Sequence, residues 1–392
     1  MKILLLKIYR KFRDVKDSFF LALFRMFFKQ EKAIIFDNFS GKGYGDSLKY
    51  IYLEVIKRKI DAKIYWVLDD NLYKNKPKDF PDNIHFVRYR SIQYLKAFAL
   101  SKVWIRNSRM PIVLKKAKTQ FYLNTMHSIL PWKKVEFDVK RNKESSIPRM
   151  IILDNNNIDL MIASCEFKEK LLRESYRYTG KILRTVLPRC DCLYNISKEQ
   201  INKLKIKYGI ESEKKIVLYA PTFRDSKSTD VYSVDFASVL NSLSMKFGGD
   251  WIFIVRLHPS IMELSSIAIF NKNVIDGTSF GDAQEFLMIS DVLITDYSSI
   301  MFDYMLTRRP IFLFATDYVE YIKERDFYYD FSSLPFTLCG NNKQLMDSIY
   351  KFDNDQYHEN LEEYINKIGL YQNEKSSSEI VVDIISKELI KD

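Results

Sequence analysis

The stretch Val292-Leu-Ile-Thr-Asp-Tyr-Ser-Ser-Ile-Met-Phe-Asp303 joins a short apolar run to an amphipathic segment through two adjacent serines. Val292–Thr295 has the apolar, β-branched character of a buried strand, and a serine can cap a helix that we predict over Ser298–Leu306. Free backbone N–H groups at a helix start, with two hydroxyls beside them, suit a phosphate group. Because an ordinary serine cap has the same appearance, the stretch by itself indicates a strand–helix unit and a candidate anion site.

Similar strand–helix units lie on both sides of this stretch and form two series. The second series has predicted strands at Lys215–Pro221, Trp251–Leu257 and Pro310–Ala315, and helices at Ser233–Phe247 and Ala283–Ile289. The first series has predicted strands at Ala33–Asn38, Ala62–Asp69, Ile84–Tyr89, Lys102–Asn107, Gln120–Thr125 and Leu160–Cys165, and helices at Asp46–Lys59, Ser91–Ser101 and Glu166–Tyr178. This alternation is typical of parallel sheets covered by helices, and therefore of an α/β fold.

The chain divides where the strands stop. Ser197–Lys214 is charged, helical in character and free of strand signals, and 392 residues suit two domains better than one. We therefore predict two Rossmann-like, doubly wound domains in tandem, at residues 31–197 and 198–392. The second domain includes helices from Gln356 onward, with a polar break at Glu374–Ser378. Ligands of such a pair are expected at the carboxyl ends of the strands, between the domains.

Residues 1–30 are rich in Leu, Ile and Phe, but lysines and arginines interrupt them repeatedly. No run approaches the roughly 20 apolar residues that a spanning helix needs. The segment is predicted to be a basic amphipathic helix that lies on an anionic membrane surface, or one that packs on its own domain. With no export signal, the expected location is peripheral, on the cytoplasmic face of the cell membrane.

The overall charge of +11 favours anionic partners. No RNA- or DNA-binding motif is present in the sequence, so nucleic acid is not an expected partner. Four scattered cysteines do not form a disulfide framework or a zinc motif, and no metal or cofactor is expected. Gly41-Lys-Gly-Tyr-Gly-Asp46 lacks the pattern of a P-loop or a dinucleotide fingerprint, which argues against an ATPase or an oxidoreductase.

Two further strand ends in the second series carry chemistry. The predicted strand Trp251–Leu257 places Arg256 and His258 at its carboxyl end. Both side chains can neutralise charge on a leaving phosphate. Lys215–Pro221 is followed by Thr222, Arg224 and Asp225, and the guanidinium can clamp a diphosphate with two hydrogen bonds. The simpler readings are a structural histidine and a surface Arg–Asp turn.

The first series offers a general base. His127 follows the strand Gln120–Thr125, and an imidazole with a pKa near neutrality can deprotonate an acceptor hydroxyl. Lys133 and Lys134 follow it and can attract an anionic acceptor.

Together these segments resemble the CDP-glycerol glycerophosphotransferase family, the teichoic-acid primases and polymerases of Gram-positive bacteria. The resemblance extends from about Asn38 to Asp330. It rests on Tyr219-Ala-Pro-Thr-Phe-Arg-Asp225, Arg256-Leu-His-Pro259, Thr295-Asp-Tyr-Ser-Ser-Ile-Met-Phe-Asp303, Arg309-Pro-Ile, Tyr318-Val-Glu-Tyr321, Arg325-Asp-Phe-Tyr-Tyr-Asp330, Leu187-Pro-Arg-Cys-Asp191 and the glycine turn at Gly41–Asp46.

The resemblance implies a GT-B-like fold that transfers a polyol phosphate, glycerol phosphate first among the candidates, from a CDP-polyol to a hydroxyl of a lipid-linked wall or capsule polymer precursor, with release of CMP. It implies His127 and His258 as the catalytic residues. The implied donor-binding residues are Thr222, Arg224, Asp225, Arg256, Asp296, Ser298, Ser299 and Asp303, and the implied acceptor-binding residues are Gly41, Asp46, Lys133 and Lys134.

Two alternatives stay open at this point. A glycosyltransferase that uses a nucleotide-sugar donor can have the same fold, because function depends on the site rather than on the scaffold. A non-catalytic membrane scaffold is the other, and its support is Ser128, which stands where the family has a glycine after the histidine.

Overall fold

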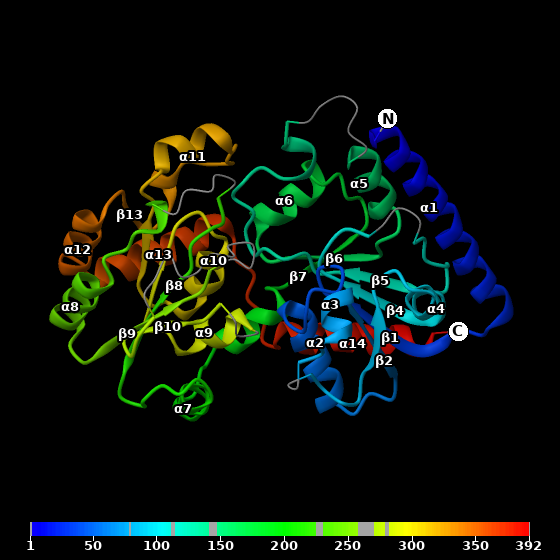
Figure 1. Cartoon of the computed structure of the whole chain (residues 1–392), viewed down its shortest axis with the longest axis horizontal. Helices are drawn as coiled ribbons and strands as arrows, with labels where there is room; N and C mark the ends of the chain where they lie inside the picture. The colour runs from blue at the N-terminus through cyan, green and yellow to red at the C-terminus, as the bar shows by residue number, and fades with distance from the viewer. Residues whose placement is uncertain are drawn as a thin grey trace. The chain divides into compact units, whose positions relative to one another are not determined.

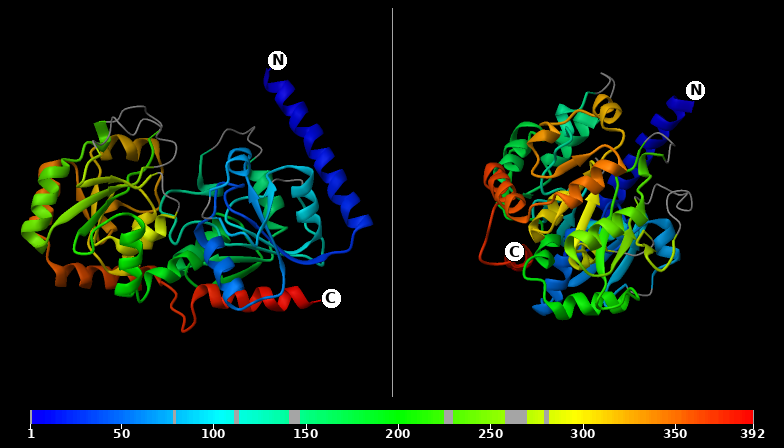
Figure 2. Two further views of the ribbon diagram at one scale, coloured as in Figure 1. Left: turned by 60° about the horizontal axis from the view of Figure 1, so that its bottom comes forward. Right: turned by 90° about the vertical axis from the view of Figure 1, so that its left-hand side faces the viewer.

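The computed structural model of the chain describes residues 2–77, 80–110, 114–140, 147–224, 230–257, 270–278 and 282–391. These residues form two compact units (Figures 1 and 2). Unit 1 comprises Met1–Ser128, Val135–Asp191 and Tyr371–Asp392, and unit 2 comprises Ile129–Lys134 and Cys192–Leu370. The chain therefore passes between the units several times.

Unit 1 contains a parallel sheet of seven strands in the order β3-β2-β1-β4-β5-β6-β7. Its strand order reverses between β1 and β4, and the carboxyl ends of these two strands are where a doubly wound sheet binds ligands. The strands are β1 Glu31–Asp37, β2 Lys63–Leu68, β3 His85–Arg88, β4 Ser101–Arg106, β5 Phe121–Asn124, β6 Leu160–Ala163 and β7 Lys181–Arg184.

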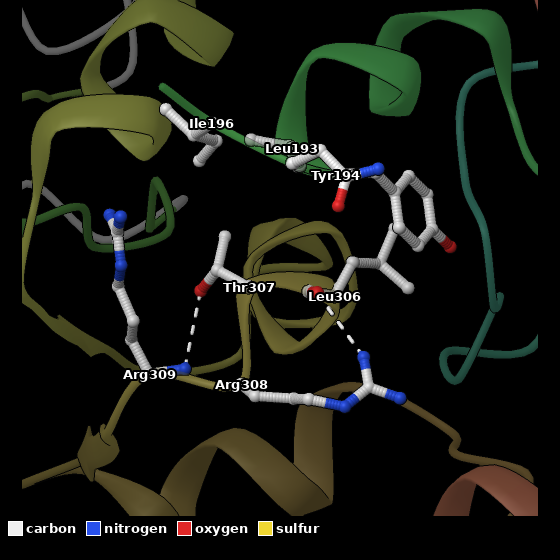
Figure 3. Close-up of a pocket in the computed structure, with 8 residues that line it drawn as sticks. Leu193, Tyr194, Ile196, Leu306, Thr307, Arg308 and Arg309 are labelled. Atoms are coloured by element: carbon white, nitrogen blue, oxygen red, sulfur yellow. Dashed lines mark hydrogen bonds between the residues drawn. The ribbon is translucent and has the colours of Figure 1, made fainter. Parts of the chain in front are cut away.

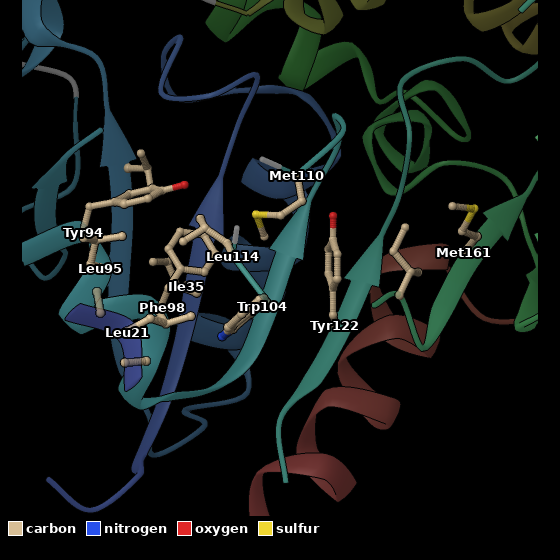
Figure 4. Close-up of a cluster of buried hydrophobic side chains, with 14 of the residues drawn as sticks. Leu21, Ile35, Tyr94, Leu95, Phe98, Trp104, Met110, Leu114, Tyr122 and Met161 are labelled. Atoms are coloured by element: carbon tan, nitrogen blue, oxygen red, sulfur yellow. The ribbon is translucent and has the colours of Figure 1, made fainter. Parts of the chain in front are cut away.

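Successive strand residues point to opposite sides of this sheet, and in β1 and β4 the residues on both sides are buried. Helices therefore cover both faces. Ile35 of β1 and Trp104 of β4 join a buried cluster with Phe98, as Figure 4 shows, whereas the neighbouring Phe36 stacks edge-on against Tyr52. The helices of unit 1 are α1 Lys2–Phe27, α2 Asp46–Lys57, α3 Asp70–Lys74, α4 Ile92–Leu100, α5 Ile147–Asn155, α6 Glu166–Glu174 and α14 Ser377–Ile390, with short 3₁₀ turns η1 Glu136–Asp138 and η2 Pro188–Leu193.

Unit 2 repeats the arrangement with six parallel strands in the order β10-β9-β8-β11-β12-β13. This is the doubly wound order 3-2-1-4-5-6, with the reversal between β8 and β11. The strands are β8 Lys215–Tyr219, β9 Trp251–Val255, β10 Val274–Asp276, β11 Val292–Thr295, β12 Ile311–Phe314 and β13 Thr337–Cys339. The helices are α7 Lys198–Lys207, α8 Phe236–Phe247, α9 Ala283–Ile289, α10 Ile300–Tyr304, α11 Tyr318–Glu324, α12 Asn342–Tyr350 and α13 Asn354–Ile368, with 3₁₀ turns η3 Asp230–Tyr232, η5 Met305–Thr307 and η6 Phe331–Ser333.

The predicted fold class, two Rossmann-like α/β domains, is confirmed. The structure differs from the predicted boundaries at two places. Residues 371–392 are predicted in the second domain, but α14 packs on α2, β1 and β4 of unit 1, where Val381, Val382 and Ile385 are fully buried. Residues 129–134 are predicted in the first domain, but they belong to unit 2.

Helix α1 packs on its own unit through one face. Leu21 is buried in the cluster that includes residues of α4, and Arg25 donates hydrogen bonds to the Lys115 carbonyl and the Gln120 side chain at 2.7 and 2.8 Å. The opposite face of the helix is exposed. It carries four apolar residues spaced at helical intervals, Phe12, Val15, Phe19 and Met26. Within the described part of the chain, no helix is both long and apolar enough to cross a membrane.

Candidate functional site

In unit 1, buried amide side chains connect the carboxyl ends of β1 and β4. Asn107 donates from Nδ2 to Asn38 Oδ1 at 2.6 Å, and its own Oδ1 accepts from the Phe39 backbone N–H at 2.8 Å. Asn38 in turn donates to the Gly43 carbonyl at 3.2 Å. These bonds fix the loop that follows β1 against the end of β4.

Gly41 is required by the path of this loop. Its φ is +93°, and a Cβ added there would lie 2.5 Å from the backbone nitrogen of Asp69. Just before it, Phe39 and Ser40 have φ values of 46° and 61°, a region that bulky side chains rarely occupy. Gly41 therefore shapes the loop through its backbone, while its predicted contact with an acceptor stays a prediction.

His127 lies beside this loop, three residues after β5. Its Nδ1 is 3.3 Å from the Asn107 carbonyl oxygen, and its ring meets the Phe39 ring edge-on at 5.5 Å. A carbonyl oxygen can only accept, so this contact places the proton on Nδ1 and the lone pair on Nε2, for which the described residues supply no hydrogen-bond donor. The predicted base thus has the tautomer that general base catalysis needs.

The surroundings also favour the neutral form of this imidazole. Although part of the side chain is exposed, loss of water to nearby protein lowers the pKa of His127 below its ordinary value of 6.5, against the opposing charge of Asp46. Arg189 and Lys168 act in the same direction as the loss of water. At neutral pH the ring can therefore accept a proton.

Two buried cations hold the backbone at this histidine. Arg189 donates to the His127 carbonyl at 3.0 Å and pairs with the Asp46 carboxylate at 3.1 Å. Lys168, which is fully buried, donates to the Ser128 carbonyl. Asp46, predicted to bind the acceptor, therefore has a demonstrated partner within unit 1, and it positions His127 through Arg189.

In unit 2, a buried ion network lies at the carboxyl ends of β8, β11 and β12. Arg224 pairs with Asp296 at 2.8 Å and with Asp317 at 2.6 Å, and it donates to the Thr222 carbonyl at 2.7 Å. The Thr222 backbone N–H also donates to Asp296 at 2.8 Å. The network joins the carboxyl ends of the neighbouring strands β8 and β11, where the strand order reverses.

This geometry bears on the predicted role of Arg224 as a diphosphate clamp. All three guanidinium nitrogens already donate to Thr222, Asp296 or Asp317, so a phosphate held by two guanidinium N–H groups would have to displace one of these partners. Burial acts to raise the pKa of Asp317, yet the hydrogen bonds and charge of Arg224 outweigh it and lower that pKa. The clamp stays a prediction, and the structure gives Arg224 a direct part in holding the strand ends together.

Aromatic rings cover this network. Tyr297 and Tyr321 stack at 3.8 Å with an interplanar angle of 4°, and the Arg224 guanidinium lies 4.6 and 4.8 Å from the two ring centres. Tyr297 also donates its hydroxyl to Asp317 at 2.9 Å. The stack excludes water from the ion pairs and strengthens them.

Lys133 and Lys134 lie in unit 2 rather than in unit 1. Trp132 is buried against Phe327 and Phe331 and donates from Nε1 to the Tyr297 carbonyl at 3.2 Å. Lys133 donates to the Tyr321 hydroxyl at 2.8 Å, and Lys134 lies 4.0 Å from the Asp326 carboxylate. The segment after His127 is therefore part of the unit that holds the predicted donor-binding residues.

The remaining predicted donor residues fall into two groups. Ser298 and Ser299 precede α10 and are partly exposed, and Ser299 forms no side-chain cap bond. Asp303 is buried and accepts from Gln284 at 2.9 Å, and Arg256 donates to the Gly277 carbonyl at 2.7 Å. His258 and Asp225 lie outside the described residues, so their roles stay predictions.

A polar pocket of about 270 Å³ lies elsewhere in unit 2, before the start of β12 (Figure 3). Its two arginines are bonded to protein: Arg308 to Glu362 at 2.7 Å, and Arg309 to the Met288 and Ser290 carbonyls at 2.8 and 2.6 Å. The pocket is at the opposite ends of the strands from the candidate site, which argues against a substrate-binding role.

Several residues of both sites were not predicted from the sequence. Asp317 follows β12 and could have been found by the rule that identified Asp296, since each is an acidic residue just past a strand. Asn107 carries the same signal after β4. Lys168 is within α6, where a lysine reads as a surface residue, and no local pattern distinguishes it.

The fold and these strand-end sites define a GT-B-like protein with two Rossmann-type units. The chain matches the family described as CDP-glycerol:poly(glycerophosphate) glycerophosphotransferase over residues 18–387, and it belongs to that family. The resemblance inferred from its motifs is thereby confirmed.

Individual relatives agree with this membership. The teichoic acid poly(glycerol phosphate) polymerase of Bacillus spizizenii is 28% identical over 397 residues, covering 97% of this chain and 99% of that protein. A polymerase of the same description from Staphylococcus epidermidis is 30% identical. That match covers 91% of this chain but only 51% of that protein. The teichoic acid glycerol-phosphate transferase of Staphylococcus aureus is 29% identical, with 85% of each chain covered.

Solved structures give the same result. A histidine-to-alanine variant of the wall teichoic acid polymerase TagF superposes with a TM-score of 0.82 at 27% identity, over 97% of this chain and 98% of that chain. A TagF variant soaked with CDPG gives 0.80 at 27% identity, over 98% of both.

Proposed function

We propose that this chain transfers a polyol phosphate, most simply glycerol phosphate, from a CDP-polyol to a hydroxyl of a lipid-linked wall or capsule polymer precursor. The observation that carries the proposal is His127, whose Nδ1 faces the Asn107 carbonyl and whose pKa is lowered. A neutral imidazole with a free Nε2 is a general base. Family membership, and relatives named as glycerol-phosphate polymerases and transferases, supply the reaction class.

The proposed step balances without a co-reactant. Nε2 of His127 takes the proton of an acceptor hydroxyl, whose oxygen forms a bond to the β-phosphorus of the donor. The bond between that phosphorus and the oxygen bridging to the α-phosphate breaks, and CMP leaves with the bond electrons. Positioning and fixed positive charge supply most of the acceleration in phosphoryl transfer.

On the donor side, the hydroxyls of Ser298 and Ser299 are available to phosphate oxygens. Thr222 has a buried Oγ1 for which the described residues offer no hydrogen-bond partner, although its backbone is bonded to Asp296. Such a hydroxyl at a strand end is suited to a ligand oxygen. His258 and Arg256 are proposed to neutralise the charge of the leaving phosphate.

The test is CMP release from CDP-glycerol and from CDP-ribitol with a lipid-linked acceptor, together with product analysis. Acceptor-dependent release with a phosphodiester product supports the proposal and names the polyol. His358 is the matched control for His127, because its Nδ1 also faces a backbone carbonyl, that of Asn354 at 2.8 Å, on a surface helix. A glycosidic product, or full turnover after His127→Ala, would overturn the proposal.

We further propose that the chain acts at the surface of the membrane that carries its acceptor, with α1 in contact with it. The exposed stripe of Phe12, Val15, Phe19 and Met26 lies opposite the face packed on unit 1. The same helix can therefore pack on its own domain with one face and contact the membrane with the other. The experiment is flotation with vesicles containing anionic lipid. Phe12→Glu with Phe19→Glu should weaken flotation, whereas unchanged binding by this variant would exclude the stripe as the contact.

A further inference from the structure

Lys133 is a half-buried lysine whose ammonium has no anionic partner within the described part of the chain. Its Nζ donates to the Tyr321 hydroxyl at 2.8 Å, and among the described residues no carboxylate is paired with it. A lysine taken out of water normally forms an ion pair, because desolvation of an unpaired charge is costly. The ammonium therefore has capacity for an anion that the described residues do not supply.

The nearby carboxylates are already engaged by other cations. Asp296 and Asp317 both pair with Arg224, and Asp326 is approached by Lys134 at 4.0 Å. The charges around Lys133 are therefore Asp296 and Asp317, which are negative, against Arg224, Arg325 and Lys133 itself, which are positive. Counted over these described residues, the corner of unit 2 at the ends of β8 and β11 carries one excess positive charge.

The backbone of this lysine is fixed, and its ammonium is held by the hydrogen bond to the Tyr321 hydroxyl. Lys133 forms an isolated antiparallel bridge with Phe327, and Trp132 and Lys134 exchange backbone bonds of 2.9 and 2.8 Å with Tyr328 and Asp326. The buried Trp132 side chain anchors the same segment. A cation held this rigidly is preorganised for a ligand.

The Tyr321 hydroxyl completes the arrangement. Because it accepts a hydrogen bond from Lys133, its own proton remains to be donated, so the pair presents an ammonium and a phenol to one oxyanion. The stacked ring of Tyr297 links this pair to the start of the Ser298–Ser299 segment. Phosphate is the anion that fits this chemistry, since lysine binds it as a point charge supported by neutral donors.

We propose that Lys133, with Tyr321, binds the diphosphate of the CDP-polyol donor, so that it is a donor-binding residue of unit 2 rather than an acceptor-binding residue. This inference rests on the proposed function and assigns one residue of its donor site. Loss of water, opposed by Asp296 and reinforced by Arg224 and Arg325, lowers the pKa of Lys133 to about 8. The cation is therefore present at neutral pH and is lost as the pH rises through that value.

The experiment measures the dissociation constant of CDP-glycerol for the full chain by calorimetry at pH 7, and the KM for the lipid-linked acceptor at saturating donor. Lys133→Met should weaken donor binding by about tenfold to a hundredfold, the usual effect of losing a charged hydrogen bond, and leave the acceptor KM unchanged. Lys323→Met, at an exposed lysine of α11 two residues after Tyr321, should leave both quantities unchanged. Lys133→Arg keeps the charge and should restore most of the donor affinity.

The outcomes separate this inference from the function on which it rests. No binding of CDP-glycerol by the unmodified chain would overturn the proposed donor. Binding by the unmodified chain with an equal affinity in Lys133→Met, or a change confined to the acceptor KM, would overturn only the assignment of Lys133. If Lys133→Met does not fold, the unmodified chain still decides: donor affinity must fall as the pH rises from 7 to about 9, and a constant affinity contradicts the inference.

Discussion

The two units share one strand order around the reversal point, yet the carboxyl ends of their sheets are built from different interactions. In unit 1, β1 and β4 are joined by the buried ion pair of Arg106 and Asp37 and, just past it, by the neutral amides of Asn38 and Asn107, and the loop beside them has residues at positive φ. In unit 2, β8 and β11 are joined by the ion network of Arg224, Asp296 and Asp317. The same scaffold therefore holds the proposed base in one unit and a larger network of fixed charges in the other.

This difference suits the two halves of a phosphoryl transfer. The groups that contact the His127 ring, the Asn107 carbonyl and the Phe39 ring, carry no charge, so they can orient the imidazole without making it a cation. Together with Lys133 and Arg325, the network of unit 2 carries excess positive charge, which is suited to a diphosphate but would suppress a base placed inside it. Dividing the tasks between two sheets lets each be adjusted separately, and the following variants test that division.

The largest effect is expected from the base. His127→Ala should lower the rate of CMP release by about 10²- to 10⁴-fold, because that is the range that positioned general bases contribute. The rate is measured at saturating CDP-glycerol and acceptor, and donor affinity should change little. His358→Ala should match the unmodified chain, and an equal loss in both variants would show that the effect is not specific to the site in unit 1.

The next largest effect concerns the stability of unit 2. Arg224→Met leaves the buried Asp296 and the partly buried Asp317 without a cation, which should cost about 3–5 kcal/mol of unfolding free energy. Urea denaturation, followed by a probe that reports unit 2, measures it. Arg308→Met is the comparison, because its pair with Glu362 is exposed and should be worth less than about 1 kcal/mol. A similar loss in both would contradict the special role of the buried network.

The pH dependence of turnover should combine both units in one bell-shaped profile. His127 must be neutral and its pKa lies below 6.5, so the rate rises with pH through that region by up to about tenfold per unit. Lys133 must be charged and its pKa is about 8, so activity at limiting donor falls above that value. Lys133→Arg should shift the alkaline limb to higher pH and leave the acidic limb in place. A shift of both limbs would show that the two sites do not titrate independently.

The smallest effect should come from the pair that flanks the base. Asp46 raises the pKa of His127 and Arg189 lowers it, so Asp46→Asn should shift the acidic limb to lower pH and Arg189→Met should shift it to higher pH. Each change in rate at neutral pH should be no more than about tenfold, since one unit of pKa corresponds to that factor. Nuclear magnetic resonance titration of the His127 ring measures the two shifts directly, and shifts of equal sign would exclude an electrostatic origin.

The interior strands of both sheets could be predicted from the sequence, whereas most edge strands could not. β1, β4, β8 and β11 are buried on both faces and read as continuous apolar runs. The edge strands β7, β10 and β13 are short and partly exposed, so their sequences carry no comparable signal. For this reason β7, β10 and β13 were not predicted from the sequence.

The candidate site shows the same limit in another form. His127, Asp46 and Asp296 could be identified because each lies just after a strand or at the start of a helix. The crossing of Ile129–Lys134 into unit 2 could not, since it depends on the pocket that Phe327 and Phe331 form around Trp132. Contacts between segments that are distant in the sequence leave no local pattern, and this is why Lys133 was assigned to the wrong unit.

The return of α14 to unit 1 has a consequence for how the chain folds during its synthesis. The helix contributes Val381, Val382, Ile385 and Leu389 to the buried surface over α2, β1 and β4, all of which are made more than 270 residues earlier. Until those last residues leave the ribosome, the unit translated first has an uncovered apolar face. Unit 2 meanwhile has all of its strands and helices available by Leu370. The order of translation and the order of completion are therefore opposite, and a nascent chain paused near residue 370 should need a chaperone for its earlier half.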